Sequence, residues 1–427
     1  MTVEMLKPAP EPAGMTMKRN FVWTWLGNVI YLGTQWALLV ILTKLGTIEV
    51  VGQFFMGMAV TAPVIIFSQM QLRQALVTDT SNAFHLLDYF IARLIHTLVA
   101  LGGVILWLWC MQYPGQLKYI VLLIAISKGI ESLSDIMHGK FQKNNRMDYI
   151  AISMITRGTL TLPVFGYILS RTGSLASALL SMIVVWTGVV LCYDTPHFIQ
   201  CARNECPGYR WRASKFFMLC RTAFPLSLAS GLTSFSGNIP RYYLQYFFGK
   251  EAVGLFSVAA VPLNFITSIQ MALGNTVMGR AAVYYQTGKE KEFSGISRKT
   301  TIASLATSIF FFTIFLFWGK ELMTILFSST YASAVPALVV MSAGTILSGF
   351  RFYGSLVSHS GRMFNLQLIN MVLVVVLQGI VGFFLVSRWS FLGAAWLEFG
   401  KSFFYVFFFW WVGAKRNRFT QTDKAQN

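Results

Sequence analysis

Seven basic side chains interrupt long apolar stretches of the sequence. They are Arg93, Lys128, Arg157, Arg221, Arg241, Arg351 and Lys401. Three acidic residues lie in stretches of the same kind, namely Glu131, Asp135 and Glu398. An arginine or lysine at the centre of a bilayer costs about 2.5–3.5 kcal/mol even on the scale that penalises it least. We therefore expect these charged groups to face water, other protein groups or a substrate, and not lipid.

The five arginines have no acidic residue at helical spacing, and arginine stays protonated at physiological pH. Its planar guanidinium group binds phosphate oxygens in pairs. The pattern predicts a cationic, water-filled cavity for a phosphate-bearing substrate, contacted by Arg93, Arg157 and Arg241. Arg221 and Arg351 are predicted near the cytoplasmic interface, where they either reach the substrate or extend their side chains to the interface.

The acidic residues occur beside lysines. Lys128, Glu131, Asp135 and His138 have the spacing that places them on one face of a helix, and Lys401 follows Glu398 by three residues. Such pairs either hold helices together or bind and release a coupling ion. The candidates for ion coupling are Glu131, Asp135, Glu398, Lys128 and Lys401.

The composition indicates that these charged groups belong to a membrane protein. Of 427 residues, 55% are hydrophobic and 12% are charged, whereas soluble domains carry about 25% charged residues. This excludes a soluble enzyme. The net charge of +18 comes from short basic clusters between apolar runs, which indicates membrane topology and not nucleic-acid binding. The sequence contains no nucleotide-binding loop or catalytic motif, and His197, Cys201 and Cys206 have irregular spacing for zinc. We therefore expect no metal and no cofactor other than coupled H+ or Na+.

Apolar runs of about 20 residues predict twelve transmembrane helices. Their centres lie near residues 33, 60, 100, 127, 159, 184, 228, 262, 310, 343, 376 and 402. With the N-terminus in the cytoplasm, the cytoplasmic segments hold 21 basic residues and the external loops hold six. Because cytoplasmic loops are enriched in lysine and arginine, both termini are predicted to be cytoplasmic.

The sequence also contains an internal repeat. Glu49-Val50-Val51-Gly52-Gln53-Phe54 recurs as Glu251-Ala252-Val253-Gly254-Leu255-Phe256, an E-x-V-G-x-F pattern about half the chain apart. Because each repeat holds six helices, the two copies keep the same orientation and are related by an axis along the membrane normal. The predicted fold is all-α, with twelve transmembrane helices in two six-helix lobes related by a pseudo-two-fold axis. The predicted parts are a disordered cytoplasmic tail (1–18), an N-lobe (19–200), a cytoplasmic linker (201–217), a C-lobe (218–414) and a basic cytoplasmic tail (415–427).

Three stretches resemble the bacterial polysaccharide and lipopolysaccharide flippases of the multidrug/oligosaccharidyl-lipid/polysaccharide exporter superfamily. They are Leu72-Arg73-Gln74 with Val77-Thr78-Asp79, Asp88-Tyr89 and Arg93; Lys128-Gly129-Ile130-Glu131-Ser132-Leu133-Ser134-Asp135 with its continuation to Arg157-Gly158; and Asn238-Ile239-Pro240-Arg241-Tyr242 with Phe248-Gly249. Together with Gly393-Ala394-Ala395, the resemblance covers nearly the whole chain.

The resemblance implies two six-helix lobes that move a polyprenyl-pyrophosphate-linked oligosaccharide from the inner to the outer leaflet of the bacterial cytoplasmic membrane. It further implies a role in surface polysaccharide or lipopolysaccharide assembly, with a polysaccharide polymerase and chain-length proteins as candidate partners. Related lipid flippases with fourteen helices use the extra pair to form a groove for the lipid tail, and the twelve spans expected here provide no such pair.

Three other classes of protein fit the sequence less well. An ion-coupled antiporter of small molecules in the same superfamily favours an acidic cavity, because typical drug substrates are cations, and the charges counted here have a basic excess. An integral-membrane polysaccharide polymerase needs a sizeable external loop, and the predicted external loops have about 15 residues or fewer. A scaffold would not need seven basic residues in its spans. The sequence therefore favours a transporter over an enzyme.

Overall fold

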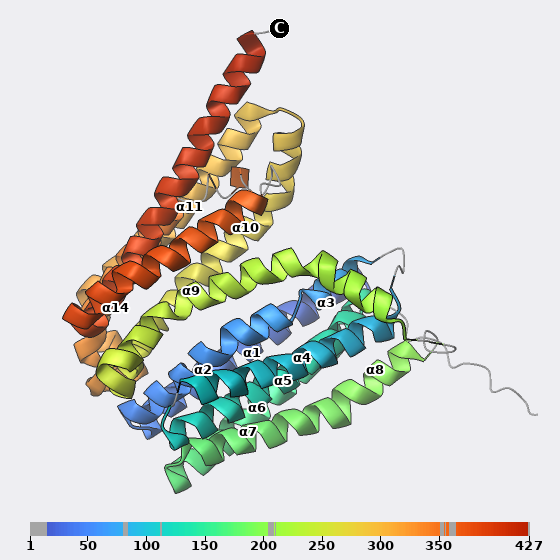
Figure 1. Cartoon of the computed structure of the whole chain (residues 1–427), viewed down its shortest axis with the longest axis vertical. Helices are drawn as coiled ribbons and strands as arrows, with labels where there is room; N and C mark the ends of the chain where they lie inside the picture. The colour runs from blue at the N-terminus through green and yellow to red at the C-terminus, as the bar shows by residue number, and fades with distance from the viewer. Residues whose placement is uncertain are drawn as a thin grey trace, which may run out of the picture. The chain divides into compact units, whose positions relative to one another are not determined.

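All regular elements in the described part of the chain are helices, which confirms the predicted all-α fold (Figure 1). The computed structural model describes residues 15–79, 84–111, 113–203, 209, 211–350, 354, 356–357 and 364–425. The elements are α1 (Met17–Leu45), α2 (Ile48–Ser68), α3 (Leu72–Thr78), α4 (Leu86–Cys110), α5 (Gly115–Lys143), α6 (Met147–Thr172), α7 (Leu175–Val189), the π-helical turn η1 (Val190–Asp194), α8 (Thr195–Ala202), α9 (Ala213–Ala260), α10 (Leu263–Gln286), α11 (Glu290–Leu326), the 3-10 turn η2 (Ser329–Ala334), α12 (Val335–Phe350) and α14 (Phe364–Ala425).

Nine helical stretches within the described residues are long and apolar enough to cross a membrane. α9 and α14 each run through a residue with a positive φ, Gly249 (φ 77°) and Ser390 (φ 49°), at which two helices meet. α5 is not among the nine, because charged residues interrupt its apolar run. Counting α5, dividing α14 at Ser390, and joining the part of α9 after Gly249 to α10 gives twelve long helical segments in the described chain. That all twelve cross the membrane stays a prediction.

The chain separates into two compact units. Unit 1 consists of Met1–Thr47 and Gly57–Ser234, and unit 2 of Ile48–Met56 and Phe235–Asn427. The boundary at residue 234 lies inside α9, after the predicted linker, because the first part of α9 packs with unit 1. α1 begins at Met17, within the predicted tail, and residues 1–14 lie outside the described chain.

The segment at the start of α2 belongs to unit 2 because it carries the first copy of the repeat and packs against the second copy. Glu49 Oε2 lies 2.7 Å from Lys250 Nζ, and Lys250 directly precedes the second copy. The E-x-V-G-x-F pattern therefore marks a contact between the two copies as well as a repeat in the sequence.

In unit 1, α5 contacts α3, α4, α6, α7, α8 and η1 (Figure 1). The face that it buries carries small or polar residues, among them Gly129, Ser132, Ser134 and His138. Small residues let helices approach closely inside a membrane, and polar residues form hydrogen bonds across the interface. The polar composition that lowers the hydropathy of α5 thus makes it the helix that organises the polar interior of unit 1.

The helix that begins as α2 breaks before α3. Met70 and Gln71 both have left-handed backbone angles (φ 50° and 49°), a conformation that is uncommon for residues other than glycine. The chain then forms the short helix α3, which contacts α4 and α5. This break redirects the chain so that side chains of α3 reach the polar face of α5.

The start of α4 is fixed by its own cap and by the linker. His85 accepts a hydrogen bond at Nδ1 from the Leu87 amide, and Asp88 Oδ2 accepts one from the His85 amide, which forms a capping box. Tyr209 of the linker donates a 2.6 Å hydrogen bond to Asp88 Oδ1, and its ring lies 4.6 Å from that of His85. Burial and the Asp88 carboxylate raise the pKa of the Tyr209 hydroxyl. The linker is therefore anchored at the end of α4.

Unit 2 is built on contacts between consecutive helices. α10 packs on α11 and α12, α11 on α12, and α12 on α14. Phe293, Leu356 and Val357 form one buried apolar cluster, and Val374, Tyr405 and Phe408 form another between the two halves of α14.

Candidate functional site

Unit 1 contains an open polar cavity of about 480 Å³ beside α5. Its lining consists mainly of carboxamide, guanidinium and carboxylate side chains, together with a hydroxyl and an isopropyl group. The lining residues are Gln69, Gln71, Arg73, Gln74, Val77, Thr78, Arg93, Asp135 and Gln142. Such a lining offers both donors and acceptors of hydrogen bonds. A cavity of this chemistry inside an otherwise apolar chain is our candidate functional site.

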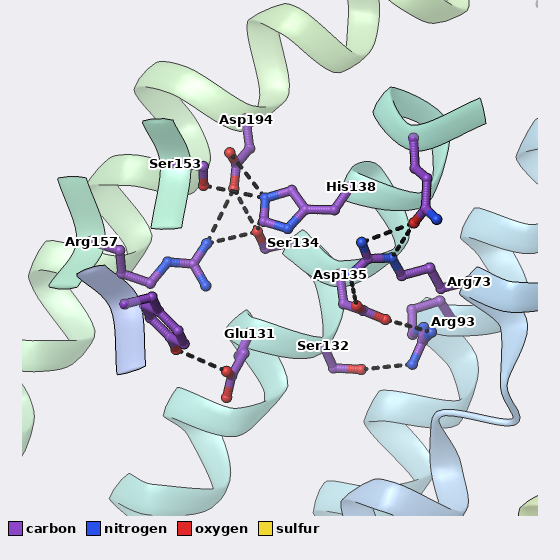
Figure 2. A network of polar contacts seen from close by, with 12 residues as sticks. Arg73, Arg93, Glu131, Ser132, Ser134, Asp135, His138, Ser153, Arg157 and Asp194 are labelled. Carbon is purple, nitrogen blue, oxygen red and sulfur yellow. Dashed lines mark hydrogen bonds and ion pairs between the residues drawn. The ribbon is translucent and has the colours of Figure 1, made fainter. Parts of the chain in front are cut away.

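Two arginines share one carboxylate in this cavity. Arg73 Nη1 lies 2.9 Å from Asp135 Oδ1, and Arg93 Nη2 lies 3.2 Å from Asp135 Oδ2 (Figure 2). Arg73 also donates to Gln142 Oε1 from Nε and Nη2, at 3.3 and 3.0 Å. The Arg93 side chain is 1% exposed, whereas those of Arg73 and Asp135 are 32% and 27% exposed. Arg73 and Asp135 are thus the charged groups of the cavity that solvent reaches.

Arg73 was not among the predicted site residues. The sequence places it in a short connection at the predicted cytoplasmic side, where it was counted as a topology charge. The structure adds a contact that the sequence did not indicate, because the break at Gln71 and the short α3 turn its guanidinium toward α5. The available signal was the run of glutamines around it, Gln69, Gln71 and Gln74, which is unusual beside an apolar helix.

A second polar cluster lies on the other side of α5 (Figure 2). Asp194 Oδ2 accepts a 2.6 Å hydrogen bond from Ser134 and lies 3.2 Å from Arg157 Nη2. His138 Nε2 lies 3.2 Å from both Ser134 Oγ and Ser153 Oγ, and 3.6 Å from Asp194 Oδ1. The side chains of Asp194 and Arg157 are 0% and 3% exposed. This cluster is a closed internal network that links α5 to α6 and η1.

Asp194 is the other residue that the sequence did not identify. It ends the π-helical turn η1, in which the Thr195 amide bonds to the Val190 carbonyl, and Pro196 follows at the start of α8. π-Helical turns occur frequently at functional sites. The wider turn carries the carboxylate inward to Arg157, and the Thr-Pro pair after an acidic residue was the sequence signal that could have indicated it.

The four residues predicted to share one face of α5, namely Lys128, Glu131, Asp135 and His138, contact different neighbours. Glu131 accepts hydrogen bonds from Lys128, at 2.7 Å, and from Tyr31 of α1, at 3.1 Å. Asp135 faces α3 and α4, while His138 faces α6 and η1. Each of the four residues therefore has a partner within the protein, as expected if they hold α5 to its neighbours. A role in ion coupling stays a prediction.

Two of the arginines predicted to contact substrate thus pair with protein carboxylates. Arg93 pairs with Asp135 and Arg157 with Asp194, both contributed by other helices. Spacing along one helix could not reveal these partners, because the pairs join residues 42 and 37 positions apart. Of the two, Arg93 lines the cavity.

The third arginine, Arg241, lies in unit 2 with neutral partners. It donates from Nε to Ser257 Oγ at 2.8 Å, and from Nη1 to Asn238 Oδ1 at 2.9 Å and to the Gly237 carbonyl at 3.1 Å. Its guanidinium carbon lies 5.8 Å from the centre of the Phe256 ring. These hydrogen bonds fix the side chain, and the Glu398 carboxylate of unit 2 is an acidic group that interacts with its charge.

The remaining predicted residues are placed as follows. Glu398 forms an ion pair with Lys401 and accepts a hydrogen bond from Gln378 Nε2, whose Oε1 in turn accepts one from Ser236. Arg221 is exposed on α9. Arg351 lies outside the described residues.

Comparison with known proteins agrees with this fold. Residues 17–279 match the sequence profile of the family described as polysaccharide biosynthesis protein. The capsular polysaccharide biosynthesis protein CapF of Staphylococcus aureus is 26% identical over 381 residues, covering 89% of this chain and 94% of CapF.

Solved structures show the same architecture. An inward-facing multidrug resistance MATE family transporter of the MOP superfamily superposes with a TM-score of 0.73 at 11% identity, over 93% of this chain and 99% of that one. The lipid II flippase MurJ in an inward closed conformation also gives a TM-score of 0.73, at 12% identity, over 93% of this chain and 87% of MurJ. The family match confirms the predicted resemblance to polysaccharide biosynthesis proteins, and the solved structures confirm the predicted fold.

Proposed function

Because the chain belongs to the family of polysaccharide biosynthesis proteins, we propose that it is a flippase for a polyprenyl-pyrophosphate-linked oligosaccharide. The flippase moves this lipid from the inner to the outer leaflet of the bacterial cytoplasmic membrane by alternating access. Its product then enters the assembly of surface polysaccharide or lipopolysaccharide, where a polymerase and chain-length proteins are the expected partners.

The polar cavity of unit 1 is the observation that carries this proposal. A sugar hydroxyl that leaves water without a new hydrogen-bond partner costs several kcal/mol, so a bilayer blocks an oligosaccharide headgroup. The carboxamides of Gln69, Gln71, Gln74 and Gln142 can replace the lost water. The guanidinium group of Arg73 supplies the charge and the planar donors that suit a phosphate. The cavity thus provides partners for both parts of the headgroup.

The predicted topology puts the cavity on the side from which such a lipid is loaded. Arg93 lies seven residues after Leu86, where α4 begins, so it is about 10 Å along the helix. Asp135 lies eight residues before Lys143, where α5 ends, at a similar depth. In the predicted topology both of these helix ends are cytoplasmic. The cavity then lies in the inner half of the membrane, in reach of a headgroup in the inner leaflet.

A small-molecule antiporter is supported less well. A cationic drug needs a carboxylate that is free to pair with it, whereas Asp135 already pairs with two arginines. The MATE likeness shows the fold, and the lining of the cavity favours an anionic, hydroxyl-rich substrate.

The energy for transport is proposed to come from the membrane potential or an ion gradient. Outward movement of a negative headgroup is favoured by a potential that is negative inside, by about 2.3 kcal/mol per charge per 100 mV. H+ or Na+ coupling through Glu131, Asp135 or Glu398 is tested in liposomes with an imposed gradient. Glu131→Gln, Asp135→Asn and Glu398→Gln keep the shape of each side chain and remove its charge. At least one should lose its response to the gradient, and unchanged transport in all three would make them structural charges.

Deletion of the gene tests the function in cells. The expected result is accumulation of a lipid-linked oligosaccharide on the cytoplasmic face, with loss of the corresponding surface glycan. Wild type expressed from a plasmid should restore the glycan. Arg73→Ala should not, at equal protein level. Normal surface glycan in the deletion strain would contradict the proposal.

A further inference from the structure

Asp135 occupies the position at which a substrate anion would meet Arg73. Its Oδ1 lies 2.9 Å from Arg73 Nη1, the geometry of a charge-assisted hydrogen bond. Of the acidic residues predicted for ion coupling, Asp135 is the one that lines the polar cavity. Glu131 is held by Lys128 and Tyr31, and Glu398 pairs with Lys401 in unit 2.

Arg73 can be reached by a ligand, whereas Arg93 lies behind the carboxylate. The Arg73 side chain is about one third exposed, and the Arg93 side chain is buried. The Asp135 carboxylate and a phosphate both bind guanidinium groups through oxygen, so they compete for Nη1 of Arg73. A phosphate bound there would also lie beside Asp135, and two like charges at that distance disfavour each other.

A proton removes this conflict. When Asp135 is protonated, it no longer repels the phosphate, it releases Arg73, and it gains an O–H that can donate to a phosphate oxygen. Arg93 keeps one positive charge beside the site. Anion binding and proton binding at Asp135 therefore favour each other, as linkage requires.

We propose that a phosphate anion replaces Asp135 at Arg73 Nη1 and that Asp135 takes up one proton from the water of the cavity as it does so. This inference rests on the proposed function. It names Arg73 as the residue that binds the pyrophosphate group, and it couples this binding to the uptake of a proton by Asp135. No covalent bond changes except the O–H bond formed at Asp135.

The other charged groups near Asp135 must be separated from it in any pH experiment. The groups that face it from the elements packed against it are Arg73 of α3 and Arg93 of α4. Two histidines lie on the same helices, and both face other groups. His138 faces Ser153 and Asp194, and His96 contacts Cys220 Sγ at 3.4 Å.

The test measures binding of geranylgeranyl pyrophosphate to the full chain in lipid nanodiscs between pH 5.5 and 8. Calorimetry in two buffers of different ionisation enthalpy gives the number of protons taken up. Geranylgeraniol, which lacks the pyrophosphate, controls for binding of the chain alone. The probe's own ionisation is common to all variants, so each is compared with wild type at the same pH.

Asp135→Asn should bind the pyrophosphate probe about tenfold tighter than wild type at pH 7.5 and take up no proton. Wild type should approach this affinity as the pH falls, with proton uptake. Arg73→Gln should bind at least tenfold more weakly than wild type. Glu49→Gln, which removes a carboxylate from an exposed ion pair outside the cavity, should behave as wild type.

Two outcomes separate the two proposals. If wild type binds the probe and Asp135→Asn binds no tighter, or still takes up a proton, the exchange at Arg73 is refuted while the flippase function stands. If wild type binds the pyrophosphate no better than the alcohol and also fails to restore surface glycan in the deletion strain, the proposed function itself is refuted.

Discussion

Gly52 and Gly254 occupy the same position in the two copies of the E-x-V-G-x-F repeat and pack backbone to backbone in unit 2. A Cβ atom on Gly254 would lie 2.6 Å from the carbonyl oxygen of Ile48, and one on Gly52 would lie 2.7 Å from the carbonyl carbon of Lys250. Real Cβ atoms essentially never approach backbone atoms this closely. Glycine at both positions is thus required by the contact between the copies.

Gly52→Ala should weaken this contact, since neither backbone can move aside without shifting its helix. Overpacking of this kind typically costs about 1–3 kcal/mol. The measurement is cross-linking by a short bismaleimide between cysteines placed at Glu49 and Lys250, whose charged side-chain ends lie 2.7 Å apart. Cross-linking should fall in Gly52→Ala and stay unchanged in Gly33→Ala, where a Cβ meets no atom within 4 Å. Equal cross-linking in both would show that the repeat contact does not depend on glycine.

The buried pair of Arg157 and Asp194 should contribute to stability more than to transport. Asp194→Asn leaves the guanidinium group buried without a counter-ion, and breaking such a pair typically costs about 3–5 kcal/mol. We expect a large fall in the melting temperature of the purified protein. The double variant with Arg157→Gln should lose less than the sum of the two single variants. Glu49→Gln removes a carboxylate from an exposed pair and should leave the melting temperature unchanged. An unaltered melting temperature in Asp194→Asn would contradict the structural role.

Arg241 should affect transport without a matching loss of stability. Its contacts are to the uncharged groups of Ser257, Asn238 and Gly237, so its removal leaves no carboxylate unpaired in these contacts. Transport should decrease in the order Arg, Lys, Ala, because lysine keeps the charge and loses the planar donors. The measurement is surface glycan at matched protein level, with Arg171→Ala at the exposed end of α6 as the control. Normal glycan in Arg241→Ala would remove this residue from the substrate path.

Much of the fold could be predicted from the sequence because it rests on local patterns. Apolar runs give the helices, and the E-x-V-G-x-F copies give the repeat. The breaks inside α9 and α14 depend on Gly249 and Ser390, and the sequence placed a loop near each. Most of the architecture can therefore be predicted from the hydropathy and from the internal repeat.

The site could be predicted only in part, because ion pairs between helices depend on how those helices pack. Arg93 and Arg157 were found as buried charges, but their partners Asp135 and Asp194 come from other helices. Arg73 was missed because the two left-handed residues before it redirect the chain so that α3 contacts α5. A charge at the end of an apolar run can belong to a loop or to a cavity, and the sequence pattern is the same in both cases.

The predicted topology can be tested by labelling single cysteines in a cysteine-free protein. A cysteine at Lys118 should react with a membrane-impermeant maleimide in intact cells, because this segment is predicted to be external. A cysteine at Lys289 should react only after the membrane is opened, because its loop is among the segments rich in basic residues that are predicted to be cytoplasmic. Labelling of both positions in intact cells would contradict twelve spans with cytoplasmic termini.

The most direct test of the central claim is flipping of a polyprenyl-pyrophosphate-linked oligosaccharide in proteoliposomes. A glycosidase added outside reports how much of the lipid has its headgroup in the outer leaflet. With wild-type protein and an imposed potential, the account predicts that the protected fraction becomes accessible within minutes, and that Arg73→Gln slows this at least tenfold. Accessibility that rises no faster with wild-type protein than in protein-free liposomes would contradict the account.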